Sequence, residues 1–433
     1  MSKRNIVVVG AGIGGLSAAH WLTQRGHDVE VLEAADRPGG RMQLLERRGD
    51  LVDVGAQFFH SSYKSALGFI DELGLAGNRR TISAATQFAR PDGSKFLLRH
   101  DWDFPRLLGP GGSASLIAFA LRYLVLGRRF PMSQIVRSIP AYDDVSAADI
   151  LGRSHPRHLD YVVRPVCFGE TVAYPEHTSL YHYLHQVRLT LYTRFVALSS
   201  GVSSLTDALA RRVSVRYEAP VRGVIWEGSR VSGVELEDGS ACKADHVIVA
   251  TTPDAAARIL PDQMEEQRGF LASFPRTPIP LPIFFLDRPL DPEVCFYFGD
   301  PSEDRSFNMA VDQTARVPDM VPSGKAIVSA WAAYPKTEEL IARADDRLIE
   351  TALEDMEKLI PGFSGWVDDV ALVRHGWGNA IYPPGQYQGV IDFRSKAEAL
   401  RGISFVGSPY GGVHMEAAIL TAKRAVTRVE QGQ

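Results

Sequence analysis

The first forty residues alternate between apolar runs that suit strands and a stretch with helical spacing. Residues 6–9 are continuously apolar, and residues 29–32 form a second strand-like run. Between them, residues 16–25 carry apolar side chains three and four positions apart, the spacing of an amphipathic helix. A strand, a helix and a second strand in this order predict one βαβ unit with parallel strands.

The turn between the first strand and the helix is rich in glycine. Gly10, Gly12 and Gly15 form a G-x-G-x-x-G pattern, with Gly14 inside it. In such a turn the first glycine permits a tight bend, the second lets backbone approach a pyrophosphate, and the third allows close helix–strand packing. Glu33 ends the second strand, where its carboxylate can accept hydrogen bonds from ribose hydroxyls. The unit therefore predicts dinucleotide binding.

The residues after Glu33 indicate which dinucleotide is bound. Ala34 follows, and a second glycine turn at Gly40 is flanked by Arg37 and Arg41. The arginines can bring bidentate donors to the far side of a diphosphate, which a plain NAD site does not need. In this pattern the chain resembles the FAD-dependent amine oxidase superfamily, in which a G-x-G-x-x-G turn is followed by E-A-x-x-R-x-G-G-R. That superfamily includes monoamine oxidases, protoporphyrinogen oxidases and carotenoid desaturases.

The resemblance implies further FAD contacts downstream. It places Gly55, Ala56 and Gln57, with Phe58 beside them, along the flavin, where small residues let backbone approach the ring. The alternative is an ordinary strand-to-loop turn. It also places the backbone at Val221 near the adenine.

The carboxyl end repeats the strand, glycine turn and helix. Residues 403–407 form an apolar strand, 408–412 a glycine turn, and 413–426 an alanine-rich helix. The positive end of such a helix can face the flavin's pyrimidine edge, where negative charge develops on reduction. Gly407, Ser408, Val413 and Met415 are the predicted cofactor contacts in this segment.

The remaining patterns predict a fold of class α/β plus α+β, with a discontinuous Rossmann-type FAD domain and an inserted substrate domain of sheet and helices. The FAD domain is predicted over 1–78, 201–260 and 366–433, and the substrate domain over 79–200 and 261–365. Further predicted elements are a helix over 65–75, a hairpin over 87–98, a helix over 202–211, a strand over 213–217, a β-meander with strands over 221–227 and 231–237 that 243–251 closes, a strand over 283–286 after a proline-rich lead-in at 274–282, and a helix over 345–359.

Two stretches of the substrate domain have more than one interpretation. Residues 164–174 and 181–192 concentrate aromatic residues and histidines, which indicates either a packed helical core or a cavity for a large planar or apolar molecule. Residues 115–126 are apolar and followed by Gly-Arg-Arg at 127–129. We expect a buried helix there, and the alternative is an interfacial helix whose basic end touches lipid headgroups.

Composition excludes several function classes. The chain has 433 residues, 45% of them hydrophobic, and a formal net charge of -4, so nucleic acid is not an expected partner. Its three cysteines are widely spaced and suggest neither disulfides nor a metal site. No signal peptide or membrane-spanning run is expected. These features favour a cytoplasmic enzyme, with peripheral membrane contact as the alternative.

Departures from the family pattern narrow the activity. In monoamine oxidases the segment before Pro-Pro-Gly carries a cysteine bonded to the flavin and then a cage tyrosine, and these positions are Trp377 and Gly378 here. The second cage tyrosine corresponds to His414. We therefore expect non-covalent FAD. The chain also has no lysine between Lys243 and Lys325, which counts against simple primary-amine oxidation.

The expected activity is removal of a hydride from a C–H next to N–H or C–H of a large, mostly apolar or cyclic substrate, with dioxygen reoxidising FAD. The alternatives are an amine oxidase with an altered aromatic cage and a protein that keeps FAD without net oxidation. His414 is the predicted catalytic base, because imidazole titrates near neutrality, and its other interpretation is a helix-capping or packing residue. Trp377 and Tyr382 are further candidate catalytic residues, and His375 and Tyr410 candidate pocket walls.

Overall fold

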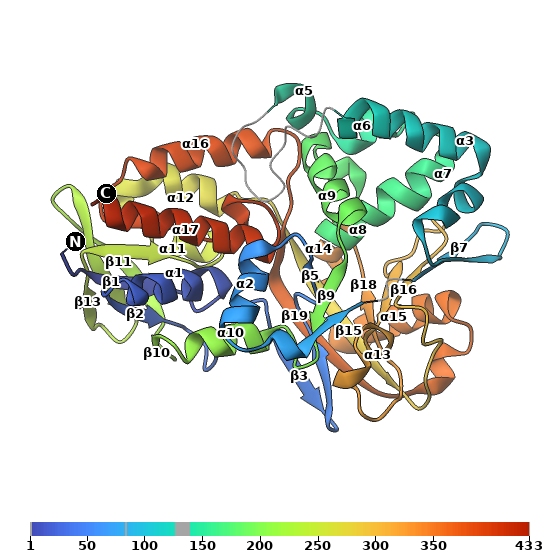
Figure 1. Cartoon of the computed structure of the whole chain (residues 1–433), viewed down its shortest axis with the longest axis horizontal. Helices are drawn as coiled ribbons and strands as arrows, with labels where there is room; N and C mark the ends of the chain where they lie inside the picture. The colour runs from blue at the N-terminus through green and yellow to red at the C-terminus, as the bar shows by residue number, and fades with distance from the viewer. Residues whose placement is uncertain (1, 83–84, 126–138, 433) are drawn as a thin grey trace.

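The computed structural model describes residues 2–82, 85–125 and 139–432. Figure 1 shows two halves side by side. The half that holds both chain termini is built on a parallel sheet, and the other half is built on a larger mixed sheet with helices above it and one long helix below. The predicted mixed α/β fold, with a parallel sheet and a second sheet accompanied by helices, is confirmed.

The parallel sheet has five strands in the described chain, in the order β10-β2-β1-β14-β20. Along the central strand, Ile6 and Val8 face one hydrophobic core while Val7 and Val9 face a second one, which explains the continuous apolar run. The strands are β1 (Asn5–Val9), β2 (Asp28–Leu32), β10 (Ser214–Arg216), β14 (His246–Val249) and β20 (Ile403–Phe405).

Helices cover one face of this sheet, and a small antiparallel sheet with further helices covers the other. The first layer joins the two ends of the chain, since α1 (Ile13–Gln24) packs beside α17 (Met415–Gln431) (Figure 1). The second layer contains a meander of β11 (Val221–Glu227), β12 (Arg230–Leu236) and β13 (Ala241–Lys243), with α11 (Pro253–Ile259), α12 (Glu265–Ala272) and α16 (Gln386–Glu398). The strand predicted to close the meander, 243–251, is instead β14 of the parallel sheet.

The order of the strands creates a crevice at the carboxyl ends of β1 and β14. The chain leaves β1 toward β2 on one side, and β14 lies on the other side. In open α/β sheets, ligands bind at such a topological switch point. The predicted glycine turn therefore lies at the sheet's preferred binding position.

The second sheet has seven strands in the order β19-β15-β18-β17-β16-β7-β8, and only the β16–β7 pair is parallel. These are β7 (Thr86–Ala89), β8 (Lys95–Leu98), β15 (Arg276–Leu286), β16 (Phe296–Phe298), β17 (Met309–Asp312), β18 (Ile327–Trp331) and β19 (Val367–Ala380).

The proline-rich lead-in belongs to β15, so the strand begins at Arg276 rather than residue 283. Pro278, Pro280 and Pro282 occur at every second position, and their missing N–H groups therefore face one side of the strand. β19 pairs with the strand over Arg276–Leu286, whereas β18 joins it only at residues 283–285. The prolines are tolerated because no neighbouring strand needs those donors.

Two elements cross the predicted domain boundaries. β19 starts the segment expected in the FAD domain at 366–433, yet it pairs along β15 as an edge of the seven-stranded sheet. α12 lies within the predicted substrate segment 261–365, yet its Leu271 packs in the core beneath the parallel sheet. Strand pairing and helix docking are long-range contacts, which local patterns do not reveal.

The helical layer above the mixed sheet begins with a helix that is interrupted before a proline. α3 (Phe104–Phe119) is interrupted at Gly109, just before Pro110, and continues into a π-helical turn, η3 (Ala120–Leu124). The expected buried helix at 115–126 is only half correct within the described residues. Phe119 and Tyr123 are buried, but Ile117, Leu121 and Val125 are among the exposed large hydrophobic residues. No helix in the described ranges is long and apolar enough to cross a membrane.

Further helices lie where the sequence predicts them, and two short sheets lie between the halves. α2 (Lys64–Glu72), α10 (Ser203–Ala210) and α15 (Asp345–Leu359) occupy the predicted helical stretches. Two short sheets lie between the halves: β3 (Leu44–Arg47) with β4 (Asp50–Asp53), and β5 (Phe59–His60) with β9 (Phe195–Leu198) and β6 (Arg79–Thr81).

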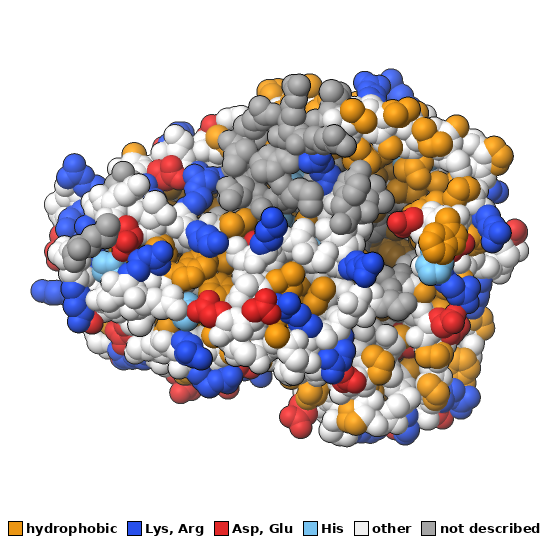
Figure 2. All heavy atoms as spheres, in the orientation of Figure 1, with side chains coloured by type: hydrophobic (Ala, Val, Ile, Leu, Met, Phe, Trp, Pro, Cys, Tyr) orange, Lys and Arg blue, Asp and Glu red, His pale blue; other side chains and the backbone are white. Residues whose placement is uncertain are grey.

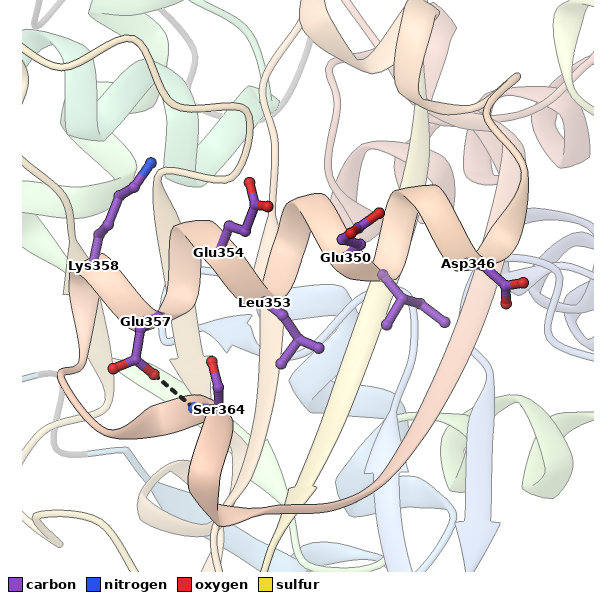
Figure 3. A pocket seen from close by; sticks show the side chains of 8 residues that line it. Asp346, Glu350, Leu353, Glu354, Glu357, Lys358 and Ser364 are labelled. Atoms are coloured by element: carbon purple, nitrogen blue, oxygen red, sulfur yellow. Dashed lines mark hydrogen bonds between the residues drawn. The ribbon is translucent and has the colours of Figure 1, made fainter.

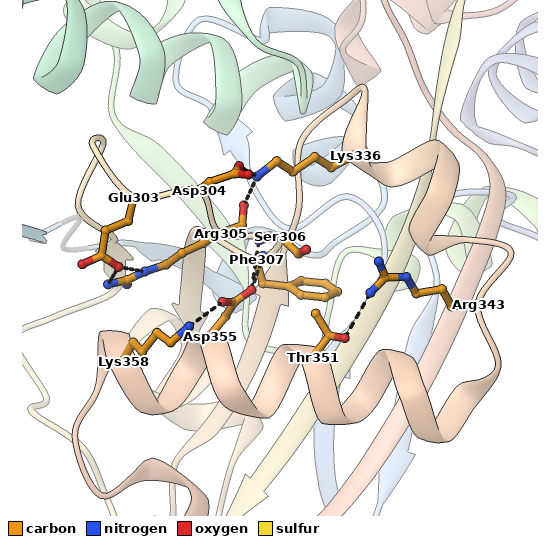
Figure 4. Close-up of polar contacts among 10 residues, drawn as sticks. All are labelled: Glu303, Asp304, Arg305, Ser306, Phe307, Lys336, Arg343, Thr351, Asp355 and Lys358. Carbon is orange, nitrogen blue, oxygen red and sulfur yellow. Dashed lines mark hydrogen bonds and ion pairs between the residues drawn. The ribbon is translucent and has the colours of Figure 1, made fainter.

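A buried carboxylate fixes a loop of the mixed sheet onto α15. Figure 4 shows Asp355 of α15 accepting hydrogen bonds from the backbone N–H groups of Ser306 and Phe307, at 3.0 and 2.9 Å. Phe307 is fully buried. Lys358, on the same helix, lies 3.9 Å from Asp355 and is mostly exposed.

Replacing Asp355 by alanine is expected to cost about 1.5–3 kcal/mol of unfolding free energy, because two backbone donors lose a charged acceptor. Lys358→Ala is the matched control and is expected to change stability by less than about 0.5 kcal/mol, since its ion pair is exposed. Chemical denaturation measures both values. Equal effects of the two substitutions would contradict this role of Asp355.

Candidate functional site

The first glycine turn fits close backbone packing on three sides and leaves one side open. Gly10 has φ 106°, and a Cβ there would lie 2.9 Å from the carbonyl oxygen of Ala250. A Cβ at Gly15 would lie 2.1 Å from the Gly10 oxygen, and one at Gly14 would lie 2.8 Å from the Val406 side chain. A Cβ at Gly12 would meet nothing within 4 Å. The open space at the start of α1 fits a pyrophosphate.

The predicted ribose acceptor lies beside this turn. Glu33 accepts hydrogen bonds from the backbone N–H groups of Ala11 and Ala35, at 2.7 and 3.0 Å. Each carboxylate oxygen keeps a further lone pair for a ligand hydroxyl. The Ala219 N–H donates to the Glu33 carbonyl, which brings the start of β11, where Val221 lies, to the same edge.

The second glycine turn folds back onto the first. The Gly39 N–H donates to the Ala11 carbonyl at 2.9 Å, and a Cβ at Gly40 would lie 3.7 Å from the Gly12 Cα. Ala34 and Arg37 lie exposed at the outer end of this arm. The two turns therefore form one continuous backbone surface.

Arg41 points from this arm toward the carboxyl-terminal segments. Its guanidinium donates to the Gly378 carbonyl at 3.3 Å and to Ser408 Oγ at 3.2 Å, and lies 5.0 Å from the centre of the Trp377 ring. Burial lowers the pKa of Arg41 to about 10, so the group stays cationic at neutral pH. Residues more than 300 positions apart in sequence meet at this side chain.

The segment predicted to lie along the flavin packs against Arg41. A Cβ at Gly55 would lie 2.0 Å from the Arg41 carbonyl oxygen, which also accepts the Ala56 N–H at 3.0 Å. Gln57 is buried, and its Nε2 has no hydrogen-bond partner among the described residues. Phe58 turns away and packs 4.4 Å from Phe195, in the core of the mixed-sheet half.

A buried ion pair supports this segment from below. Arg316 donates to Asp53 at 2.8 Å and also to the Gln57 carbonyl, and both charged side chains are inaccessible to solvent. The second Asp53 oxygen accepts the Val202 N–H at 2.9 Å. Sequence reasoning missed Arg316, because it lies 263 residues from Asp53 and no local pattern marks it.

The carboxyl-terminal helix begins two residues later than predicted. α17 starts at Met415, and His414 is its N-cap, with Nδ1 accepting the Ala417 N–H at 3.1 Å. Gly407 is fixed by its N–H bond to Thr421 Oγ at 3.0 Å. Val413 and Met415 are partly buried beside the start of the helix.

The cap changes the role that His414 can have. Because a backbone N–H can only donate, Nδ1 must be the acceptor, and the hydrogen of the neutral ring is on Nε2. In this tautomer Nε2 is a hydrogen-bond donor. To act as the predicted base, His414 would have to take up a proton on Nδ1, which would break the helix cap. His414 stacks on Tyr63 at 5.1 Å and on His185 at 5.7 Å between ring centres.

The neighbouring Glu416 was not predicted as a site residue. It is buried, and its carboxylate accepts the backbone N–H groups of Ser65 and Ala66 at 2.9 Å each, at the start of α2. The Met-Glu pair beside His414 was the available signal. The Glu416 carboxylate caps the start of α2 from the first turn of α17. This contact fixes the position of His414.

Trp377 and Tyr382 belong to one buried aromatic cluster with the helix α9 (Leu180–Tyr192). The Tyr382 hydroxyl donates to the Pro409 carbonyl at 2.7 Å, and its ring stacks on His182 at 4.6 Å. Phe274 lies 6.5 Å from the Trp377 ring. Of the two interpretations of residues 181–192, the packed helical core describes these contacts.

The two candidate wall residues lie elsewhere. His375 Nε2 donates to the Val54 carbonyl at 2.6 Å, and burial lowers its pKa, with Arg41 adding to the effect. Tyr410 stacks on Phe393 at 5.4 Å in the core under the parallel sheet. His375 therefore supports the segment before Gly55, and Tyr410 supports the glycine turn.

Comparison with known proteins decides the family. The model of the family described as flavin containing amine oxidoreductase matches residues 13–430. The chain belongs to this family. It is an enzyme of the flavin amine oxidase superfamily, and the family implies a flavin cofactor, FAD. Residue features fit that group: the open side of Gly12, the unpartnered Nε2 of Gln57 within the described chain, and the Arg41 cation between the two arms.

Several relatives are similar over much of the chain. Coproporphyrinogen III oxidase of Bacillus subtilis (strain 168) is 21% identical over 98% of this chain and 97% of its own length. Putrescine oxidase of Kocuria rosea is 39% identical, over 59% of this chain and 58% of its own length. The solved structure of an engineered triple variant of putrescine oxidase has a TM-score of 0.82 and 18% identity over 100% of this chain and 99% of that chain, which shows the shared fold.

Arg316→Met is expected to cost about 3–5 kcal/mol, because Asp53 would stay buried without its counter-ion. Burial already raises the pKa of Asp53 above the ordinary value of 3.8, and Arg316 opposes that rise. A carboxyl whose folded pKa is raised loses stability as pH rises through that value, so the deficit of the variant should be larger at pH 8 than at pH 5. Thermal melting at both pH values measures it.

Arg258→Met is the matched control, because its ion pair with Asp254 at 3.0 Å is exposed. It should change stability by less than about 0.5 kcal/mol at either pH. A deficit in Arg316→Met that is the same at both pH values would show that Asp53 does not control it.

Proposed function

We propose that the protein is a FAD-dependent oxidase or desaturase that removes a hydride from a C–H next to N–H or C–H of a large apolar or cyclic substrate. When bound, FAD supplies the two-electron acceptor, and dioxygen is the proposed final acceptor. The observation that carries the proposal is the wall at Trp377. An indole ring stands where covalent amine oxidases have a cysteine, with the half-buried Arg41 guanidinium 5.0 Å from its centre, so this wall is aromatic.

The residues of this chain have three proposed tasks. Gly12, Gly40 and Arg41 hold the diphosphate, with the guanidinium as the charged donor. Trp377 excludes water and orients an apolar ring system by packing, while Tyr382, which is fully buried, supports the glycine turn through its bond to the Pro409 carbonyl. His414 is proposed as a hydrogen-bond donor through Nε2, since its Nδ1 is held by the helix cap.

The alternative is an amine oxidase with an altered aromatic cage. The similarity to putrescine oxidase over 59% of the chain favours it. The residues at the wall disfavour it, because Trp377 and Gly378 stand where monoamine oxidases have the flavin-bound cysteine and a cage tyrosine.

Anaerobic mixing separates the two functions. A cyclic tetrapyrrole such as coproporphyrinogen III and an extended polyene represent the first class, and putrescine and benzylamine the second. The proposal expects bleaching of the flavin absorbance by a member of the first class and none by the amines, followed by recovery on admitting air. Bleaching by amines with formation of hydrogen peroxide in air would select the alternative.

His414→Asn and His414→Ala test the donor role. Asparagine is also a good N-cap, so His414→Asn should keep the stability within about 0.5 kcal/mol, whereas alanine should cost about 1 kcal/mol. Both variants should lose turnover by tenfold or more if Nε2–H stabilises developing charge. Steady-state kinetics between pH 6 and 9 and thermal melting measure these effects. Full turnover in His414→Asn would show that His414 only caps the helix.

The flavin is proposed to be held without a covalent bond. Trp377 and Gly378 provide no nucleophile where a cysteine is bonded to flavin in monoamine oxidases. Precipitation with acid should therefore release the yellow flavin into the supernatant, with chromatographic mobility equal to that of authentic FAD. Flavin retained in the washed pellet would contradict this proposal.

A further inference from the structure

The outer face of the helix over 110–125 is apolar and exposed. Ile117, Leu121 and Val125 recur every four residues and are 60%, 66% and 63% exposed, and Trp102 just before α3 is 72% exposed. The other exposed positions on this helix are Pro110, Gly111, Ala114, Ala118 and Arg122. An outward helix face with one charged residue is unusual for a protein surface in water.

The opposite face of the same helix is firmly anchored. Phe119 and Tyr123 are buried, and Phe119 lies 5.7 Å from Tyr183 and 5.6 Å from His158 between ring centres. Phe119 and Tyr123 belong to the aromatic cluster that contains Trp377. The helix is therefore apolar on both faces, and its outer face is part of the folded molecule. Figure 2 shows exposed hydrophobic side chains gathered over the region of α3 and α6.

Charge indicates what covers this face. Residues 104–125 contain two charged side chains, Arg106 and Arg122, both exposed, and no acidic residue, whereas Asp101 and Asp103 stand on either side of Trp102. Aliphatic side chains with arginine and a tryptophan at the edge are the composition of helices that lie in a lipid interface. A protein-binding patch is commonly enriched in aromatic residues at its centre and surrounded by polar groups of both signs.

A second partly apolar surface provides a contrast. The groove along α15 in Figure 3 has a volume of about 690 Å³ and contains Ile349 and Leu353. Its apolar side chains are flanked by carboxylates, those of Asp346, Glu350, Glu354 and Glu357. Anionic lipid would be repelled from that groove.

We propose that the outer face of the helix over 110–125 docks on an anionic lipid bilayer, with the helix lying in the interface plane. Ile117, Leu121 and Val125 enter the boundary of the acyl chains, and Arg122 contacts headgroup phosphates. The contact is peripheral. It depends on the exposed apolar stripe and is independent of the redox reaction.

Flotation of the full-length flavoprotein with vesicles tests the proposal. Wild-type protein should float with vesicles of 70% phosphatidylcholine and 30% phosphatidylglycerol. Ile117→Ser/Leu121→Ser should lower the partition coefficient about tenfold or more, because two aliphatic side chains no longer enter the bilayer. Leu353→Ser, in the acidic groove of α15, is the matched control and should float like the wild type.

Arg122→Glu provides a second variant that leaves the apolar stripe intact. It should weaken binding to the anionic vesicles about fivefold or more and leave binding to pure phosphatidylcholine unchanged. Wild-type melting temperatures and flavin spectra would show that the variants are folded. Two outcomes would overturn the proposal: wild-type protein that does not float, or a double variant that floats as the wild type does. Concentration-dependent dimers abolished by Ile117→Ser/Leu121→Ser, without vesicle binding, would assign the face to a second copy of the chain.

Discussion

The ion pair between Asp53 and Arg316 is the interaction on which the two halves of the molecule depend. Arg316 comes from the mixed-sheet half, while Asp53 ends the strand that leads into residues 55–57. The same guanidinium also holds the Gln57 carbonyl, and the same carboxylate receives the Val202 N–H. Two buried charges are stable only with such complete partners. The pair therefore fixes the backbone beside Arg41 through buried contacts.

Arg41 connects this junction to the second end of the chain. Its contacts with Gly378 and Ser408 bring the amino-terminal arm, the end of β19 and the turn before α17 to one place. The family membership explains why such a side chain is needed, since a long cofactor requires two separated binding arms on one frame. The aromatic wall at Trp377 beside it is the basis for proposing an apolar rather than an ammonium substrate.

The sequence was most informative where a single segment contains the whole signal. The glycine turn at Gly10, the meander after Val221 and the helix α15 follow from local spacing, because turn chemistry and periodicity act over a few residues. The pairing of β19 with β15 and the contact of Arg316 with Asp53 join distant segments, and no local pattern encodes them. His414 was interpreted from the sequence either as a base or as a helix cap, and the geometry of α17, in which Nδ1 accepts the Ala417 N–H, favours the cap.

In the proposed site, one dinucleotide extends across both arms and passes over Gly12. Gly12→Val tests it directly, because the added side chain begins in space that contains no protein atom within 4 Å of its Cβ. Gly68→Val, on the exposed surface of α2, is the matched control. The molar ratio of flavin to protein after purification is the measurement. We expect a folded Gly12→Val protein almost free of flavin and a control that retains it; full flavin content in Gly12→Val would rule out the proposed site.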